Sequence, residues 1–439
     1  MDKCIITFAR SWISLVLTRK LGENGIRVIT GDVTRLAPAS LSRFSYESFT
    51  YPDSFDEPER FIDKLVEVAE AHYESNGNLV LIPQNQTCFV VAAHRHRFEG
   101  LVKMALPSLE KLEQVHDKGA LAELCKHQNI WVPPTIVAKE REEFKDRAIE
   151  IKYPAFVKLR KSSASVGIEK VDNADKAIEV FERLIDDFDL SSEQYPVFQQ
   201  MVEGQELCSA FLLENGKPRM EMTYRNLRQY PDGRGIGFLR ETVDAKNLEA
   251  TGIELLGALE WHGVAEIDFI VDEDGRHWLI DVNPRFWGGL AQSVESGWNF
   301  PLKYYQLAAE GHVEPFKTAA KDIKTFNPCL AMLHAFEELT KSSSAQKEIT
   351  EAMEELKNNF SHEALSSMSG FISKLGSIVN PRERFVKIFE LLDESRGAFD
   401  EFFQWDDPIP VLGLLYPLMI FIKNRKVSLD SLVPGGKPK

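Results

Sequence analysis

The sequence predicts a protein of the α/β and α+β classes, and three features of its 439 residues indicate this fold class. Over roughly the first hundred residues, short apolar runs alternate with helical patterns, which is typical of a parallel sheet covered by helices. Between residues 264 and 283, two apolar runs flank a polar turn, which indicates a β-hairpin. Past Pro315, Glu, Lys, Leu and Phe recur at helical spacing, so a mainly helical C-terminal region is expected.

The N-terminal layer can be followed element by element. Residues 3–8 and 26–32 are β-rich apolar runs, and residues 12–25 between them have a helical pattern that ends at a glycine. A second helical pattern, 61–77, precedes a third apolar run at 78–83. This order predicts parallel strands joined by helices.

Polar residues follow two of these predicted strands, at Arg10–Ser11 and at Gln84–Thr87. Ligands of open α/β sheets bind beyond the carboxyl ends of the strands, although ordinary loop polarity explains these residues as well. The first turn, "FARSWIS", lacks the G-x-G-x-x-G pattern, so a dinucleotide is not expected there.

The middle of the chain favours strands with intervening loops. Residues 116–138 predict a helix followed by a strand, and residues 153–171 predict two strands joined by a small-residue loop. Residues 195–218 predict two further strands with a polar break. Residues 264–271 and 277–283 flank "DEDGR", a composition typical of a hairpin turn.

Composition narrows the class of function. A net charge of −15 disfavours a nucleic-acid partner, because phosphate backbones require basic surfaces. The five cysteines have no paired spacing, which favours a reducing, cytoplasmic location. No signal peptide or transmembrane segment is expected. The apolar run 411–422 is shorter than the roughly 20 residues that a membrane span needs, so it predicts a core or partner surface, with peripheral membrane contact as the alternative. Apolar positions expected to be exposed in the C-terminal region are compatible with a homodimer.

The stretch "LIDVNPRFWGGL" from Leu279 to Leu290 carries the clearest chemical signal. Side chains alternate along a strand, so Asp281 and Asn283 point to one face. Asp268 lies on the partner strand of the predicted hairpin, within diagonal reach. Oxygen ligands beside the guanidinium of Arg285 suit a divalent cation that carries phosphates, whereas a solvated hairpin face is the alternative.

The segment "EIDFIVDEDGRHWLIDVNPRFWGGL" resembles the signature hairpin of the ATP-grasp superfamily, which ends in an acid, one residue and Asn-Pro-Arg. The resemblance extends over about residues 1–315. It implies a pre-ATP-grasp parallel α/β domain at 1–106, an N-terminal lobe of the two-lobed ATP-grasp fold at 107–194, and a C-terminal lobe with the catalytic hairpin at 195–315. Residues 316–439 would then form the mainly helical C-terminal region.

The resemblance also implies roles for single residues. Lys118 in "HDK" and Lys158 in "YPAFVKLR" match the two phosphate-binding lysines, and "KSSASVG" matches the loop that covers the phosphates. "QQMVEGQE" resembles the hinge that contacts adenine, and Glu206 matches the ribose-binding carboxylate. The remaining nucleotide-binding residues implied are Ser162, Ser163, Ser165, Gly167, Gln199, Gln200, Met201 and Val202.

Metal and catalytic roles follow from the same match. Asp268, Asp281 and Asn283 would hold Mg²⁺ or Mn²⁺, and Arg285 would stabilise the transferred phosphoryl and acyl groups, with Asn283 beside it. Arg240 is the first choice among the arginines of residues 223–244 for contact with a phosphate or a substrate carboxylate.

Three features depart from the family's pattern. Asp281 stands where Glu is frequent, the hinge has two glutamines, and the phosphate loop keeps one glycine.

The function implied is an ATP-dependent ligase. It would activate a small-molecule carboxylate as an acyl phosphate, join it to an amine, and release ADP and phosphate. One alternative is an ATP-grasp kinase that phosphorylates a small molecule without ligation. The other is a non-catalytic nucleotide-binding or scaffold protein, which has no chemical need for both lysines, three metal ligands and Arg285.

Overall fold

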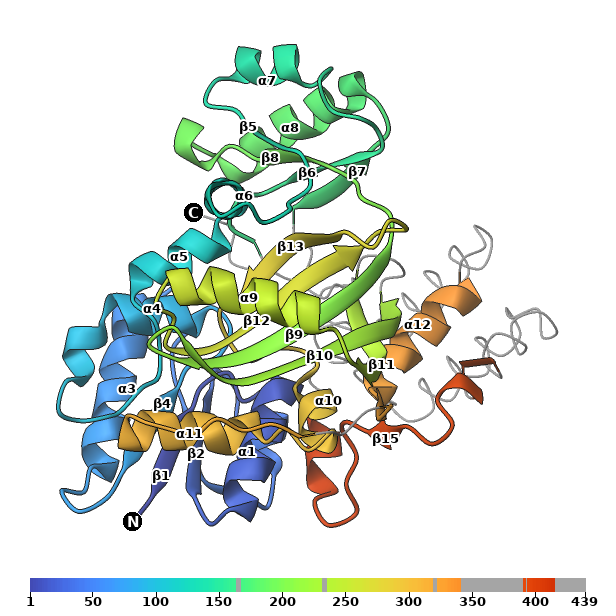
Figure 1. Ribbon diagram of the computed structural model, residues 1–439. Coiled ribbons are helices and arrows are strands. Elements are labelled where there is room, and N and C mark those ends of the chain that lie inside the picture. Colours follow the sequence, from blue (N-terminus) through green and yellow to red (C-terminus); the bar gives the residue numbers. More distant parts are fainter. Residues whose placement is uncertain (163–166, 231–234, 319–321, 341–389, 392, 415–439) are drawn as a thin grey trace, which may run out of the picture.

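The computed structural model describes residues 1–162, 167–230, 235–318, 322–340, 390–391 and 393–414. Within these residues the strands form three sheets, one in each of three layered parts of the molecule (Figure 1). The α/β and α+β prediction is confirmed in this arrangement. The predicted boundaries at 106, 194 and 315 stay a prediction.

The N-terminal part is a parallel sheet of four strands in the order β3-β2-β1-β4. β1 lies between β2 and β4, with Ile5 opposite Ile29 on one side and Leu81 on the other. Helix α3 buries one apolar stripe, which includes Phe61 and Leu65, against this sheet. The elements are β1 (Lys3–Ile6), α1 (Trp12–Glu23), β2 (Arg27–Asp32), α2 (Pro38–Leu41), β3 (Ser45–Thr50), α3 (Pro58–His72), β4 (Leu79–Ile82), α4 (Thr87–Ala93) and η1 (Arg95–Phe98).

The second part is a smaller antiparallel sheet in the order β5-β8-β6-β7, at the top of Figure 1. Helices α7 and α8 cover it, and Phe144 stacks on Phe181 with ring centroids 3.7 Å apart. Two helices, α5 and α6, lead into this lobe from the N-terminal part. The elements are α5 (Leu109–His116), α6 (Lys118–His127), β5 (Thr135–Val137), α7 (Arg141–Arg147), β6 (Ala155–Lys158), β7 (Ile168–Val171), α8 (Ala174–Phe188), η2 (Ser192–Gln194) and β8 (Val197–Gln200).

The third part is a sheet of seven strands in the order β13-β12-β9-β10-β11-β14-β15. Helix α9 packs on one face, where Gly252 lies against the ring of Phe211. Helices α10 and α11 lie between this sheet and the N-terminal sheet (Figure 1). The elements are β9 (Gln205–Glu214), β10 (Lys217–Tyr230), β11 (Ile236–Val243), α9 (Lys246–Ala258), β12 (Gly263–Val271), β13 (His277–Asn283), α10 (Leu290–Glu295) and α11 (Phe300–Glu310).

The C-terminal region adds strands to the core sheet, which the sequence pattern did not predict. β14 pairs with β11, and β15 pairs with β14 in parallel. The mainly helical prediction for residues 316–439 falls largely outside the described residues, as does most of the run 411–422. The described elements are β14 (Lys324–Phe326), α12 (Pro328–Thr340), β15 (Phe399–Asp400) and η3 (Ile409–Leu414).

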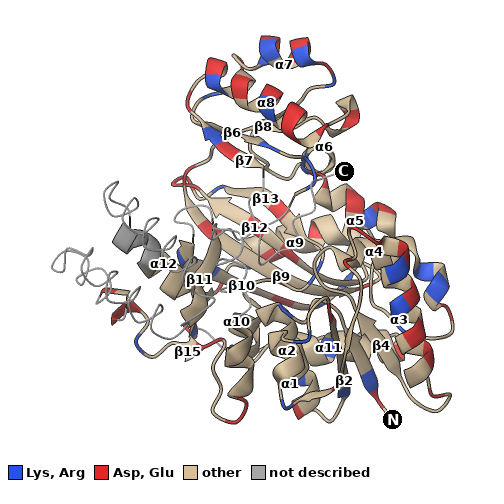
Figure 2. Cartoon of the chain, turned by 180° about the vertical axis from the view of Figure 1, so that it is seen from behind, with Lys and Arg blue, Asp and Glu red and all other residues tan. Residues whose placement is uncertain are grey.

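Charged residues of both signs are mixed along α3 and α7 (Figure 2). Several form ion pairs on the surface, such as Arg97 with Asp63 and Arg147 with Glu143. Within the described part of the chain, no helix is both long and apolar enough to cross a membrane.

Candidate active site

The hairpin of β12 and β13 brings the predicted metal ligands face to face. Asp268 is paired with Asp281, and Glu266 is paired with Asn283. The apolar residues between them, such as Ile267 and Val282, point into the core and fix the register. The Asn283 amide nitrogen donates to Glu266 Oε2 and to Asp268 Oδ2, both at 3.2 Å.

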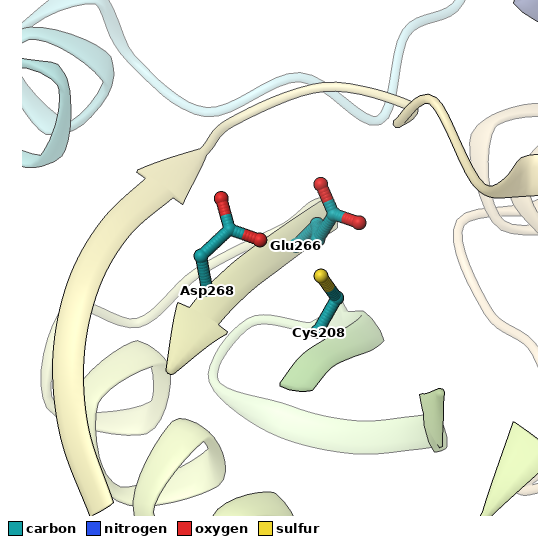
Figure 3. A group of neighbouring side chains, drawn as sticks. All are labelled: Cys208, Glu266 and Asp268. Atoms are coloured by element: carbon teal, nitrogen blue, oxygen red, sulfur yellow. The ribbon is translucent and has the colours of Figure 1, made fainter. Parts of the chain in front are cut away.

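A cluster of acids occupies the same face of the sheet. Ligand atoms of Cys208, Glu266 and Asp268 all lie within 4.8 Å of one another (Figure 3). Burial raises the pKa of Asp268 well above its usual range, and the negative charges of Glu266, Glu206 and Asp281 raise it further. Burial likewise raises the pKa of Glu266 to about 7, although a hydrogen bond from Tyr224 opposes this. A cation here would relieve the repulsion between these carboxylates.

Two lysines approach the hairpin from the smaller lobe. Lys118 is the first residue of α6, whose N-terminus is capped by Asp117 through the Gly119 N–H at 2.9 Å. The Lys118 ammonium lies 3.9 Å from Asp281 Oδ2. Lys158 ends β6, is buried, and donates to Gln199 Oε1 at 2.7 Å. Burial lowers the pKa of Lys158 to about 8, and the nearby charge of Lys118 contributes in the same direction. Two buried ammonium groups near one another suit an anionic ligand.

Ser162, near the start of the predicted phosphate loop, lies beside Lys118. The Lys118 ammonium donates to the carbonyl of Ser162 at 3.2 Å, and the buried hydroxyl of Ser162 has no hydrogen-bond partner among the described residues. Gly167 has a φ of +62°, and a Cβ there would lie 2.2 Å from Leu159 Cδ1. Only glycine therefore fits at this end of the loop. Ser163 and Ser165 lie outside the described residues.

The predicted adenine hinge runs between β8 and β9. The Gln199 amide donates to Thr135 Oγ1 at 3.0 Å while its oxygen accepts from Lys158. The backbone N–H groups of Gln200 and Met201 donate within the lobe, to the carbonyls of Pro134 at 2.9 Å and Pro154 at 3.2 Å. The Met201 N–H is thus engaged, and purine contacts by Met201 and Val202 stay a prediction.

Glu206, at the start of β9, accepts hydrogen bonds from two amides. Asn226 Nδ2 donates to its Oε1 at 2.7 Å and Gln229 Nε2 at 2.8 Å. These contacts hold the carboxylate near the acid cluster, and its predicted contact with a ribose is not tested by them.

Arg285 follows the hairpin in a turn whose next residues, Phe286 and Trp287, pack into the core. Its Nη2 donates to Asn283 Oδ1 at 3.1 Å and its Nη1 to the carbonyl of Phe286 at 2.9 Å. Phe286 and Trp287 are buried in the core. A Cβ on Gly289 would lie 2.5 Å from the Tyr224 hydroxyl oxygen, so the second glycine allows the turn to lie directly on the sheet.

Comparison with known proteins agrees with this geometry. Residues 128–288 match the family model described as D-ala D-ala ligase C-terminus. Biotin carboxylase from Campylobacter jejuni, solved as a β,γ-ATP complex, has a TM-score of 0.59 at 17% identity, over 74% of this chain and 74% of that one. L-amino acid ligase from Bacillus licheniformis has a TM-score of 0.57 at 15% identity, over 74% and 79%. The chain has the ATP-grasp fold. N5-carboxyaminoimidazole ribonucleotide synthetase from Thermotoga maritima is also similar, with a TM-score of 0.52 at 16% identity, over 74% and 79%. A search of curated protein sequences gave no match.

The ATP-grasp fold of this chain holds Arg240 in an unexpected place. Its guanidinium is 1% exposed and is paired with Glu401 from the C-terminal region and with the carbonyl of Gly237. Its Nη2 lies 3.8 Å from the Cβ position of Gly288, in the turn that carries Arg285, and not on an open surface of the site. Direct contact with a phosphate or a substrate carboxylate stays a prediction, and the burial of Arg240 favours an indirect role.

The N-terminal part of the chain also contributes to the site. A pocket beside Asp281, Asn283 and Arg285 is lined by residues that sequence reasoning did not single out, namely Cys88, Phe89 and His116, and by Asn85 and Gln86 of the polar stretch after β4. Burial lowers the pKa of His116 to about 4, and the charge of Lys118 adds to this shift, so the imidazole is neutral at pH 7. The position of His116 directly before "DK" was the signal that could have found it.

Proposed function

We propose that this protein is an ADP-forming ligase, which activates a carboxylate with ATP as an acyl phosphate and joins it to an amine. The observation that carries the proposal is the pairing of Asp268 with Asp281 opposite two buried lysines. Oxygen ligands on one side and ammonium groups on the other provide for both the cation and the phosphates of a nucleotide.

The donor set fits Mg²⁺ or Mn²⁺. Asp268, Asp281 and Asn283 offer hard oxygen ligands. The carboxylates of Glu206 and Glu266 lie near Asp268 and add negative charge, which a divalent cation would offset. When bound, the cation would neutralise charge on the phosphates of ATP. The ligand atoms of Cys208 and Glu266 lie within 4.8 Å of that of Asp268, so these side chains would affect the electrostatic potential at the cation without coordinating it.

The nucleotide would lie between the two lobes. Lys118 and Lys158 would hold its phosphates, the residues from Ser162 to Gly167 would cover them, and Gln199 to Val202 would pass the adenine. Glu206 would accept hydrogen bonds from the ribose. The side-chain amides of Asn226 and Gln229 both donate to Glu206 Oε1, so Oε2 is the oxygen that would accept from the ribose.

The chemical step requires positioning and electrostatic stabilisation and little covalent participation by the protein. The substrate carboxylate attacks the γ-phosphorus, the bond to the β,γ-bridging oxygen breaks, and ADP leaves. The amine then attacks the acyl carbon and displaces phosphate. Arg285, held by Asn283 and the Phe286 carbonyl, would donate to the negative charge that develops on the acyl phosphate.

Similar solved structures support this choice of reaction. They include an L-amino acid ligase and biotin carboxylases, one of them bound to MgADP and bicarbonate. A small-molecule carboxylate and amine are therefore the proposed substrates. A homodimer and a cytoplasmic location stay predictions.

The test is a screen of ADP release with candidate acids crossed with candidate amines, at saturating MgATP. We expect release that requires both an acid and an amine, and loss of release in Asp281→Asn. ADP release that requires one small molecule and no amine would show a kinase instead. A protein that binds no MgATP in calorimetry would refute the proposal altogether.

A further inference from the structure

The C-terminal region reaches the core through a segment that we call the strap, residues 399–414. It begins as β15, and the Glu401 N–H then donates to the carbonyl of Phe326 at 2.9 Å. It ends as η3, where Gly413 packs against Pro38 of the N-terminal part. Between these ends it carries two buried carboxylates, Glu401 and Asp407, which are 4% and 1% exposed.

Asp407 fastens the strap to the N-terminal part. Its Oδ2 accepts from Arg19 Nε at 2.8 Å and from the Ser42 hydroxyl at 2.7 Å, and its Oδ1 accepts from the Arg43 N–H at 2.8 Å. Arg19 also donates to the carbonyl of Phe402 at 2.8 Å. This end of the strap lies outside the candidate active site and uses its charge to dock one part of the chain on another.

Glu401 enters the core sheet. It is paired with Arg240, and it accepts from Thr325 Oγ1 at 2.6 Å and Asn327 Nδ2 at 3.4 Å. Side chains at paired positions of a sheet share a face. Arg240 is paired with Thr325 on one side and with Asn226 on the other.

The same face continues without a break to the metal ligands. Asn226 is two residues from Tyr224, Tyr224 is paired with Cys208, and Cys208 is paired with Asp268. Tyr224 donates to Glu266, which in turn accepts from Asn283. A row of polar side chains therefore runs across the sheet from the catalytic hairpin to the strap.

Arg240 lies under the turn that carries Arg285. Its Nη2 is 3.8 Å from the position of a Cβ on Gly288, and the Gly288 carbonyl accepts from Trp12 Nε1 at 3.3 Å. The turn therefore contacts Arg240 in the core sheet and accepts a hydrogen bond from Trp12 of the N-terminal part. Trp12 also packs in the apolar cluster that contains Phe402 of the strap.

We propose that Glu401 is a positioning residue of the active site, which balances the charge of Arg240 and so fixes the floor beneath the Arg285 turn. This inference rests on the proposed ligase function. If Glu401 lost its charge, the buried guanidinium of Arg240 would turn toward the next acid on the same face, Glu266. The hydrogen bonds that Glu266 accepts from Tyr224 and Asn283 would then be disturbed, and with them the Asn283 contact that holds Arg285.

The experiment compares Glu401→Gln with Asp407→Asn. Both variants remove one charge from a buried Arg–carboxylate pair of the strap, and the side chains of the two pairs are equally buried. Arg240 of the first pair lies beside Gly288 of the Arg285 turn, whereas the second pair docks the strap on the N-terminal part. Single-turnover ADP formation is measured with the acid and amine found by the screen, and MgATP affinity is measured by calorimetry. We expect Glu401→Gln to slow ADP formation by about 10–100-fold with unchanged MgATP affinity. Asp407→Asn should lower the melting temperature and leave the rate unchanged.

A double variant separates positioning from folding. Arg240→Met/Glu401→Leu removes both charges and leaves no buried unpaired ion, so its melting temperature should approach that of the wild type. We expect its ADP formation to remain slow, because the guanidinium under the turn is missing. Recovery of the rate together with the melting temperature would overturn the inference, as would equal rates in Glu401→Gln and Asp407→Asn. A wild-type protein without ADP release would instead refute the ligase proposal.

Discussion

Asp268 and Asp281 are directly opposite each other in the antiparallel pair of β12 and β13. Two carboxylates at paired positions repel, and this arrangement is destabilising unless a cation or a proton lies between them. Burial is the main cause of the raised pKa of Asp268, and the charges of Glu266, Glu206 and Asp281 raise it further. The pair is therefore the centre of the proposed metal site, and removing the charge of one carboxylate tests whether the pair binds a cation.

Asp281→Asn should abolish ATP turnover and leave the fold intact. The substitution takes an anionic ligand from a divalent cation but relieves repulsion with Asp268, so the melting temperature should not fall. The measurement is ADP release at millimolar Mg²⁺, with Asp274→Asn in the exposed turn of the same hairpin as the control. Wild-type rates in Asp281→Asn would contradict its assignment as a metal ligand.

MgATP affinity should fall as the pH rises above about 8. The pKa of Lys158 is lowered to about 8 by burial and by the charge of Lys118, and bound phosphates would raise it again. Below that pH the ammonium is already present, so the affinity should be constant. Above it, binding takes up a proton, and the affinity should decrease up to about tenfold per pH unit.

Calorimetry between pH 7 and 9.5 measures this effect on Lys158. Lys158→Met is the control, since it should bind MgATP more weakly and without the step near pH 8. A wild-type affinity that stays flat to pH 9.5 would show that Lys158 does not contact the phosphates.

Arg285→Lys should retain MgATP binding and lose ligation by about 100-fold or more, the loss typical of one donor to a developing oxyanion. A lysine supplies the charge but not the planar fork that reaches Asn283 and the Phe286 carbonyl together. Affinity and turnover are compared in the same preparation. Arg276→Lys, in the exposed turn of the same hairpin, is the matched control. A parallel fall in both quantities would make Arg285 a nucleotide anchor.

Asp407→Asn should lower the free energy of unfolding by about 3–5 kcal/mol, because it leaves the guanidinium of Arg19 buried without its counter-ion. Asp406→Asn is the control, since Asp406 is 59% exposed and its pairing with Arg43 at 3.9 Å contributes at most about 1 kcal/mol. Chemical denaturation of both variants measures the difference. Equal stability of the two variants would show that the strap does not depend on Asp407.

Local patterns predicted much of this architecture. The alternation of apolar runs and helical patterns gave the parallel N-terminal sheet, and the run 277–283 was predicted to its observed bounds. The period of two along the hairpin also placed Asp268, Asp281 and Asn283 on one face, because side-chain direction along a strand depends on local geometry alone. Each of these features is encoded within a stretch of a few residues.

The sequence by itself determined the hairpin, the two lysines and the ATP-grasp resemblance, since each is a short motif with its own spacing. Only the tertiary structure decided that Arg240 is buried beneath the Arg285 turn, that Glu401 is its partner, and that His116 lines the pocket. Arg240 and Glu401 are separated by 161 positions, and nothing in the local pattern around either one names the other. Their pairing arises from the order of strands in the sheet, where β15 adds to an edge that chain periodicity does not specify.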